Sequence, residues 1–132
     1  MKYEEIKRYM HRRLRFHYLV NEKRSKIGEY RDYDLSGQLR MHVFFRKDAT
    51  FGETKVFDHC GELKRHYLIG SRVCHRVAVI ENGKPATHSE EQLIEIAKEH
   101  NLPLLSELPK TEAEVTLWNL KYPDIPCLPI ES

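Results

Sequence analysis

Apolar residues recur at spacings of three and four near the start of the chain. Ile6, Tyr9, Met10, Leu14 and Tyr18 form this pattern, which is typical of one face of a helix. Glutamates stand at the beginning of the segment and arginines toward its end, an order that suits the helix dipole. The pattern therefore predicts a helix over residues 3–18, followed by an aperiodic loop over residues 21–27.

The pattern changes at Gly28, where a repeated unit begins. Residues 28–45 and residues 52–69 match at an offset of 24 positions, and a fixed period of this length indicates a repeated supersecondary unit. The matched pairs are Gly28 with Gly52, Glu29 with Glu53, Tyr33 with Phe57, Asp34 with Asp58, Gly37 with Gly61, Leu39 with Leu63, and His42 with His66.

Each unit is predicted to be a β-hairpin. Gly37 and Gly61 supply the positive φ of a tight turn, and Asp34 and Asp58 are placed to bond to the turn backbone. A partial third copy follows over residues 77–84, where Asn82 and Gly83 form a strong hairpin-turn signal. Gly70-Ser71 predicts a further turn between the preceding strand and residues 72–81.

Helical patterns return in the last third of the chain. Ser89 with Gln92, and Thr111 with Glu114, have the spacing of capping boxes. They predict two helices, one over residues 89–100 and a shorter one ending before Pro123. The apolar segment 102–109 between them is expected to pack on the sheet or a helix. Trp118 is interpreted as a core residue, with an interface anchor as the alternative.

Together these elements predict an α+β fold in a single domain, residues 1–132. A basic helix and loop occupy residues 1–27, an antiparallel β-hairpin meander occupies residues 28–87, and an acidic helical tail occupies residues 88–132. One helix thus precedes the sheet, and two helices follow it and cover one of its faces.

The phrases Tyr33-Asp34-Leu35-Ser36-Gly37-Gln38-Leu39 and Phe57-Asp58-His59-Cys60-Gly61-Glu62-Leu63 share an aromatic–Asp–x–x–Gly–x–Leu pattern. This pattern resembles the MORN repeat and the MORN-like repeats of YwqK-type antitoxin-repeat proteins. The resemblance covers residues 28–87 and implies an antiparallel meander used for contacts, with no catalytic residues. The opening segments at Gly28 and Gly52 match the family only in part, and only two copies are clean.

Charge is unevenly distributed although the net charge is only +2. Residues 1–27 carry nine lysines and arginines against three glutamates, whereas residues 88–132 carry three basic residues against nine acidic ones. A basic segment with interleaved aromatic residues suits nucleic acid or an acidic protein groove, and a solvated face is the third interpretation. The candidate partner-binding residues are Arg8, Arg12, Arg13, Arg15, Lys23, Arg24 and Lys26.

Histidines and cysteines form no recognisable catalytic or metal signature. The three cysteines include no CxxC spacing, so free thiols are expected, and we expect neither a metal nor a cofactor. A turn at Gly70-Ser71 would set His66 opposite His75, and with His42 these residues form a candidate surface histidine site. Strand histidines at a half-exposed surface are the plainer interpretation.

Three functions remain open after these observations. The first is a non-enzymatic protein that binds another protein, and the family resemblance suggests an inhibitor or antitoxin-like module. The second is an RNA- or DNA-binding factor acting through the basic segment, and the third is a small hydrolase or nuclease using the three histidines. The absence of a long apolar run predicts a cytoplasmic protein with no membrane partner, and open strand edges allow a homodimer.

Overall fold

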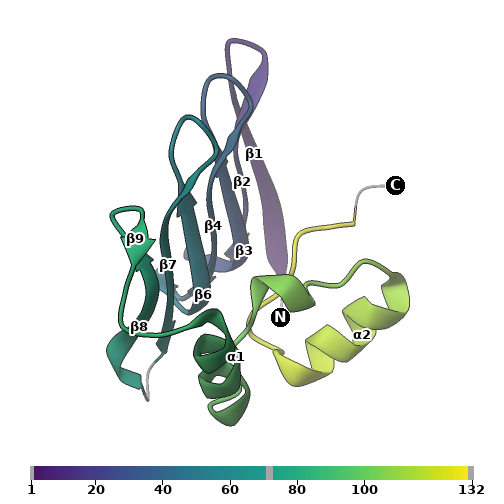
Figure 1. Cartoon of the computed structure of the whole chain (residues 1–132). Coiled ribbons are helices and arrows are strands. Elements are labelled where there is room, and N and C mark those ends of the chain that lie inside the picture. Colours follow the sequence, from purple (N-terminus) through teal and green to yellow (C-terminus); the bar gives the residue numbers. More distant parts are fainter. Residues whose placement is uncertain (1, 71–72, 131–132) are drawn as a thin grey trace.

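The main feature of the protein, seen in a computed structural model, is one antiparallel β-sheet. The structure covers residues 2–70 and 73–130, and gives only the backbone for residues 73–76. The nine strands in these residues form one sheet in the order β1-β2-β3-β4-β6-β7-β8-β9, and β5 pairs with β4 (Figure 1). The strands are β1 (Tyr3–Met10), β2 (Arg13–Asn21), β3 (Lys26–Tyr33), β4 (Leu39–Arg46), β5 (Ala49–Thr50), β6 (Gly52–Phe57), β7 (Leu63–Gly70), β8 (Val73–Glu81) and β9 (Lys84–Pro85).

The predicted N-terminal helix is wrong, because residues 3–21 form the hairpin β1–β2. Ile6 lies opposite Tyr18, and Tyr9 lies opposite Leu14, so the apolar residues with helical spacing meet across two strands. His11 and Arg12 form the turn with φ of 51° and 67°, the left-handed pair that a two-residue hairpin turn needs. Pairing of β2 with β3 and burial of Leu19 outweigh the local helical pattern.

The turns of the two clean repeats are as predicted. Gly37 and Gly61 have φ of 90° and 83°. The Oδ1 atom of Asp34 accepts hydrogen bonds from the backbone of Ser36 and Gln38, and Asp58 does the same for Cys60 and Glu62. Gly83, with φ of 75°, completes the predicted turn between β8 and β9.

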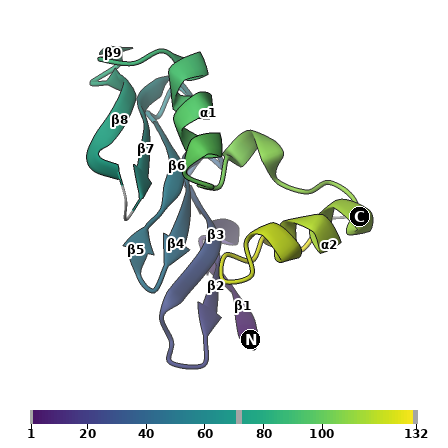
Figure 2. The same cartoon turned by 90° about the horizontal axis from the view of Figure 1, so that it is seen from below.

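The two C-terminal helices are confirmed as α1 (Glu90–Glu99) and α2 (Glu112–Lys121), with a short 3-10 turn η1 (Leu105–Glu107) between them. Ser89 caps α1 in a complete capping box, and the Thr111 hydroxyl accepts from the Glu114 backbone at the start of α2. Helix α1 lies against β7 and β8. Helix α2 lies near β2 and β3 and projects away from the sheet (Figure 2).

Two apolar clusters join these helices to the sheet. The first packs α1 residues Leu93 and Ala97 with Leu68 and Val77 of the sheet and with Leu102 and Leu104. The second surrounds Trp118, whose indole stacks on Phe44 at a centroid distance of 5.6 Å and donates to the Ile125 carbonyl at 2.7 Å. Trp118 is therefore a core residue, and the apolar segment 102–109 packs on the sheet as predicted.

Candidate binding surface

The two repeated glutamate–histidine pairs are buried contacts across neighbouring strands. His42 Nε2 lies 2.8 Å from Glu29 Oε2, and His66 Nε2 lies 2.6 Å from Glu53 Oε2. An ionised carboxylate has no proton to give, so each imidazole is the donor. The second oxygen of each carboxylate accepts a backbone N–H from the C-terminal third, from Leu128 to Glu29 at 2.9 Å and from Leu105 to Glu53 at 2.7 Å.

The glycines before these glutamates allow the C-terminal segments to approach the sheet. Gly28 and Gly52 have φ of 71° and 88°, and a Cβ atom there would lie 2.0 Å from the Pro126 oxygen and 2.5 Å from Pro103 Cγ. The following amides donate back, from Glu29 to the Pro126 carbonyl and from Glu53 to the Pro103 carbonyl. Each Gly–Glu pair, which we call a Gly–Glu clamp, thus holds one Pro-x-Leu segment.

A third copy of the glutamate–histidine pair lies in the first hairpin. His17 Nε2 is 2.6 Å from Glu5 Oε2. Glu5 precedes Glu29 by 24 positions, and His17 precedes His42 by 25. Glu4 stands where the clamps have glycine, and the Glu5 side chain is 35% exposed, compared with 3% for Glu29 and 5% for Glu53. The repeat therefore spans three hairpins, and in the part of the chain that the structure describes, the glutamates of the second and third hairpins are the ones that bind a C-terminal segment.

The clamped carboxylates are electrostatically favoured in their charged form. Burial alone would raise the pKa of Glu53, but the hydrogen bonds from His66 and the Leu105 amide lower this pKa below the usual value for a glutamate. The pKa of Glu29 is likewise lowered against the effect of burial by the hydrogen bond from His42 and the charge of Arg31. Both side chains are therefore carboxylates near neutral pH.

The strand register places these histidines in one continuous row with basic residues. Cross-strand partners run from Lys7 to His17, Arg31, His42, Lys55 and His66. Directly opposed residues share a face of a sheet, so all six lie on the face that carries Glu29 and Glu53, which we call the front face. We call these six residues the Lys/His row; a basic side chain alternates with a histidine along it.

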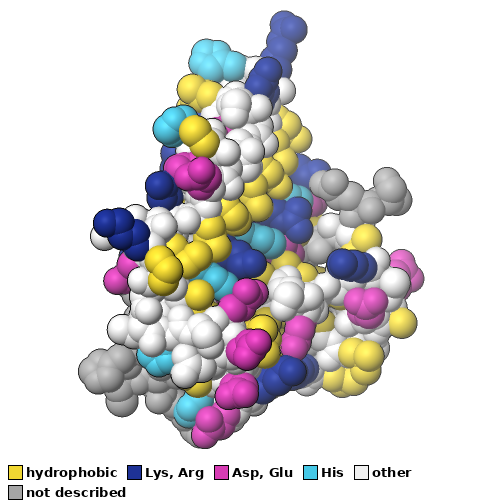
Figure 3. Space-filling view, in the orientation of Figure 1, with side chains coloured by type: hydrophobic (Ala, Val, Ile, Leu, Met, Phe, Trp, Pro, Cys, Tyr) yellow, Lys and Arg dark blue, Asp and Glu magenta, His cyan; other side chains and the backbone are white. Residues whose placement is uncertain are grey.

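A second row lies beside it, toward the hairpin turns. It pairs an aromatic residue with a leucine in each of the three hairpins: Tyr9 with Leu14, Tyr33 with Leu39, and Phe57 with Leu63. Tyr9 is 62% exposed and the other five side chains are half-buried. Figure 3 shows an apolar stripe crossing the sheet obliquely, with basic and histidine side chains alternating along its border. We call this stripe the aromatic/Leu row.

Charge on the front face is balanced. Lys7, Arg31 and Lys55 lie two residues along their strands from Glu5, Glu29 and Glu53 respectively, and Arg31 forms a 2.9 Å ion pair with Glu29. The lysines and the arginine of the Lys/His row thus equal in number the glutamates two residues along their strands. The open part of the face is therefore apolar and hydrogen-bonding, not strongly cationic.

The predicted histidine site is only partly assembled. His42 and His66 share the front face but lie on either side of Lys55, roughly 10 Å apart at the usual strand spacing. The expected pairing of His66 with His75 is wrong, because register shifts in β7–β8 set His66 opposite Ile80. Ser71 of the predicted Gly70-Ser71 turn lies outside the described residues, as do the side chains of Cys74 and His75.

The basic residues of the first segment do not form one surface. Arg12 lies in the β1–β2 turn, and Lys23 and Arg24 lie in the turn at the other end of β2. The Arg15 guanidinium donates to the Tyr33 carbonyl at 2.6 Å. The Lys26 ammonium stands 5.4 to 5.6 Å from the ring centroids of Tyr18, Tyr30 and Phe45. Arg8 and Arg13 contact the Tyr18 hydroxyl and the Leu35 carbonyl.

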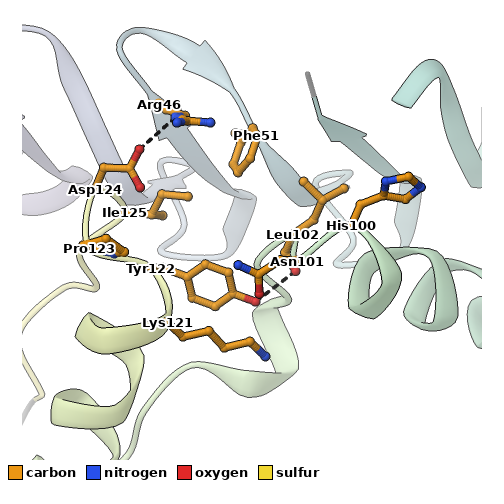
Figure 4. A pocket seen from close by; sticks show the side chains of 10 residues that line it. All are labelled: Arg46, Phe51, His100, Asn101, Leu102, Lys121, Tyr122, Pro123, Asp124 and Ile125. Carbon is orange, nitrogen blue, oxygen red and sulfur yellow. Dashed lines mark hydrogen bonds and ion pairs between the residues drawn. The ribbon is translucent and has the colours of Figure 1, made fainter. Parts of the chain in front are cut away.

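A cavity of about 290 Å³ lies between the two clamped segments (Figure 4). Arg46 closes one side through a 2.8 Å ion pair with Asp124, and the Tyr122 hydroxyl donates to the Leu102 carbonyl at 3.1 Å across its floor. The buried polar side-chain atoms left without a partner in the described residues are Asp32 Oδ1 and Thr54 Oγ1, neither of which lines this cavity. Nothing in the cavity therefore indicates a ligand.

Comparisons with protein families, with characterised proteins and with solved structures found no match. Within the described residues, no cluster of three or more histidine, cysteine or acidic side chains is arranged to hold a metal ion. The same part of the chain contains no helix whose length and apolar character would let it cross a membrane.

The residues missed by the sequence analysis are those of the first hairpin and the clamps. Glu5 and His17 match the glutamate and histidine of the repeat in residue type and nearly in spacing, so the 24-residue period itself was the signal for a third hairpin. The two segments Leu102-Pro103-Leu104-Leu105 and Ile125-Pro126-Cys127-Leu128 also repeat, at an offset of 23. They were the signal that two similar contacts hold the C-terminal third.

Proposed function

We propose that this chain is a non-enzymatic binding protein that engages another protein through the part of the front face that the C-terminal third leaves open. The observation that carries the proposal is the aromatic/Leu row, an apolar stripe that spans three hairpins and that the helices leave accessible (Figure 3). Tyrosine, phenylalanine and arginine are enriched in protein interfaces, where an apolar centre is bordered by polar groups. The Lys/His row supplies such a border.

The charge balance of the front face favours a protein over a nucleic acid. Binding to nucleic acid rests on uncompensated lysines and arginines that neutralise phosphates, but each cation of the Lys/His row has a carboxylate two residues away. The predicted basic helix, which was to provide such a surface, is a hairpin whose arginines point to several parts of the molecule.

An inhibitor or antitoxin-like role is the form of protein binding that the MORN-like resemblance suggests. The resemblance rests on the turns at Gly37 and Gly61 and on the aromatic and leucine residues beside them. Tyr33, Leu39, Phe57 and Leu63 are members of the aromatic/Leu row, so the residues that carry the resemblance are also those of the proposed surface. The partner would then be a protein that the front face covers.

The test is to capture partners with the full chain from the lysate of its source cell, and to compare two double variants. Tyr33→Ala/Phe57→Ala removes the middle of the aromatic/Leu row. Leu117→Ala/Leu120→Ala is the matched control, because these leucines of α2 are 66% and 76% exposed and lie outside the row. We expect a stoichiometric protein partner that resists nuclease and moderate salt, is lost with the first variant and is kept with the control.

Two results would contradict the proposal. One is a partner that leaves on nuclease treatment or with a steep dependence on salt, which would indicate phosphate contacts. The other is a protein partner that the Tyr33→Ala/Phe57→Ala variant, shown to be folded by circular dichroism, binds as tightly as the unmodified chain does.

A further inference from the structure

The two edges of the sheet differ in how they are protected. At one edge, β9 is two residues long and ends in Pro85, and the amides of Ala86 and His88 bond to Val79 and Ala78 along β8. At the other edge, β1 is eight residues long, pairs only with β2 among the described residues, and has exposed side chains except for the half-buried Ile6. A strand of this kind is a template for pairing with another strand.

We propose that β1 pairs antiparallel with β1 of a second copy of this chain, about a two-fold axis through Ile6. The strand sequence Tyr3-Glu4-Glu5-Ile6-Lys7-Arg8-Tyr9 is complementary to itself when it is reversed. With Ile6 opposite Ile6, Glu5 faces Lys7 of the second copy and Glu4 faces Arg8. The two-fold axis duplicates both pairs, which gives four opposite-charge contacts, and Tyr3 faces Tyr9 at each end.

The faces of the strand agree with this register. Glu5 and Lys7 lie on the front face, because Glu5 contacts His17 and Lys7 lies opposite His17. Side chains alternate along a strand, so Glu4, Ile6 and Arg8 lie on the opposite, back face. Every proposed pair therefore joins two residues of the same face, as direct opposition across an antiparallel pair requires.

Other registers oppose like charges. A shift of two residues in one direction places Glu5 opposite Glu5 on the axis, and a shift in the other direction places Lys7 opposite Lys7. A parallel pair would align each charge with its own copy. Opposed like charges destabilise a strand pair, so the sequence selects the register centred on Ile6.

The side chains of Glu4 and Arg8 can make the new contacts at little cost. The ion pair of Glu4 with Arg24 is exposed, with side chains 65% and 61% accessible, so it contributes little that pairing would lose. Arg8 contacts the Tyr18 hydroxyl at 3.4 Å through Nε, which leaves its terminal nitrogens for a carboxylate. The second copy would continue the sheet, with both front faces on the same side.

The experiment measures the assembly state of the full chain by sedimentation velocity over a concentration series. Arg8→Glu and Glu4→Arg each turn the two Glu4–Arg8 contacts of the dimer into repulsions, on the back face and away from the proposed partner surface. We expect the unmodified chain to form a dimer. The dissociation constant of the dimer should be at least about tenfold larger for each variant. An equimolar mixture of the two variants restores opposite charges and should recover the dimer.

Lys84→Glu is the control, because it makes the same kind of charge reversal at the other edge of the sheet and should leave the dimer unchanged. A chain that stays monomeric at every concentration overturns the proposal, as does a dimer that both variants preserve or that their mixture fails to restore. Tyr33→Ala/Phe57→Ala, which should abolish binding of the partner protein, should leave the assembly state unchanged. Each of the two proposals can therefore be contradicted without the other.

A crosslinking measurement covers the case in which a charge variant does not fold. In a Cys60→Ser/Cys74→Ser background, which removes the thiol that is exposed among the described side chains together with that of Cys74, Ile6→Cys lies on the axis and should form a disulfide-linked dimer on oxidation. Lys7→Cys faces Glu5 of the second copy and should not. Equal crosslinking at both positions, or at neither, contradicts the register.

Discussion

Glu53 joins three parts of the chain through one carboxylate. It accepts from His66 on the neighbouring strand and from the amide of Leu105, which lies 52 residues later, and its own amide donates to Pro103. A buried charge is tolerated when its partners satisfy it, and both oxygens of this carboxylate are bonded. Glu5 has the same histidine contact, but within the described residues no backbone amide of the C-terminal third donates to it, so Glu5 serves as a comparison for Glu53.

Removing these two carboxylates should have different consequences. We expect Glu53→Ala to lower the free energy of unfolding by about 3 to 5 kcal/mol, because His66 and the Leu105 amide lose their acceptor in a buried site. Glu5→Ala should cost about 1 kcal/mol or less, because its side chain is 35% exposed and water replaces it. Urea unfolding of both variants measures the difference, and equal losses would contradict the role assigned to the clamp.

The elements show where local pattern succeeds and where it fails. The turns at Asp34 and Asp58 and the cap at Ser89 were predictable because their bonds lie within a few residues of sequence. The local pattern of the first hairpin was misleading, because its turn uses His11 and Arg12 in place of glycine and its apolar spacing imitates a helix, so that the recurrence of Glu5 and His17 was the one sequence signal for it. Its strands are specified by pairing with β3, a tertiary contact that the local pattern does not contain.

The candidate surface was predictable only in part for a related reason. The repeat identified His42, His66 and the aromatic and leucine residues beside the turns, because these positions recur in sequence. The Lys/His row required the strand register, which a bulge shifts next to His17 in β2–β3. The docking of Pro103 and Pro126 on the glycines also escaped prediction, since each contact joins segments far apart in the chain.

The contact of Gly52 with Pro103 leads to a prediction about the Pro-x-Leu segment that this clamp holds. Gly52→Ala places a methyl group 2.5 Å from Pro103 Cγ at a φ of 88°, which combines a strained backbone with overpacking. We expect a loss of about 2 to 4 kcal/mol in unfolding free energy and faster hydrogen exchange at the Leu105 amide. Gly37→Ala is the control, because its φ is also positive, at 90°, but no atom lies within 4 Å of its added carbon. A similar loss in both variants would show that backbone strain alone is responsible.

At the scale of the whole molecule, the C-terminal third closes over the sheet through contacts of long sequence separation. Leu128 bonds to Glu29 across 99 residues, and Leu105 bonds to Glu53 across 52. Closing such long loops costs chain entropy, and the contacts that offset this cost include the charged carboxylates of Glu29 and Glu53. The stability of the closed molecule should therefore depend on pH where carboxylates titrate.

The direction of that dependence follows from the pKa shifts. Hydrogen bonds from His42 and His66 help to lower the pKa of Glu29 and Glu53 despite burial. Bonds from Ser36 and the Glu62 amide lower the pKa of Asp34 and Asp58 in the turns. A carboxyl whose folded pKa is lowered stabilises the fold above its unfolded pKa, and the contribution is lost as pH falls through the folded value. Burial raises the pKa of Asp32, which acts in the opposite direction but is a single group.

The four lowered groups therefore decide the sign, and the fold should weaken in acid. We expect the contribution of these carboxylates to be complete above about pH 5 and to decline below about pH 4.5. Urea unfolding at steps from pH 6 to pH 3 measures the slope. Glu53→Gln keeps an oxygen acceptor for Leu105 but has no charge to titrate, so its slope should be shallower than that of the unmodified chain. Parallel slopes would show that the clamped carboxylate is not one of the groups that couple pH to stability.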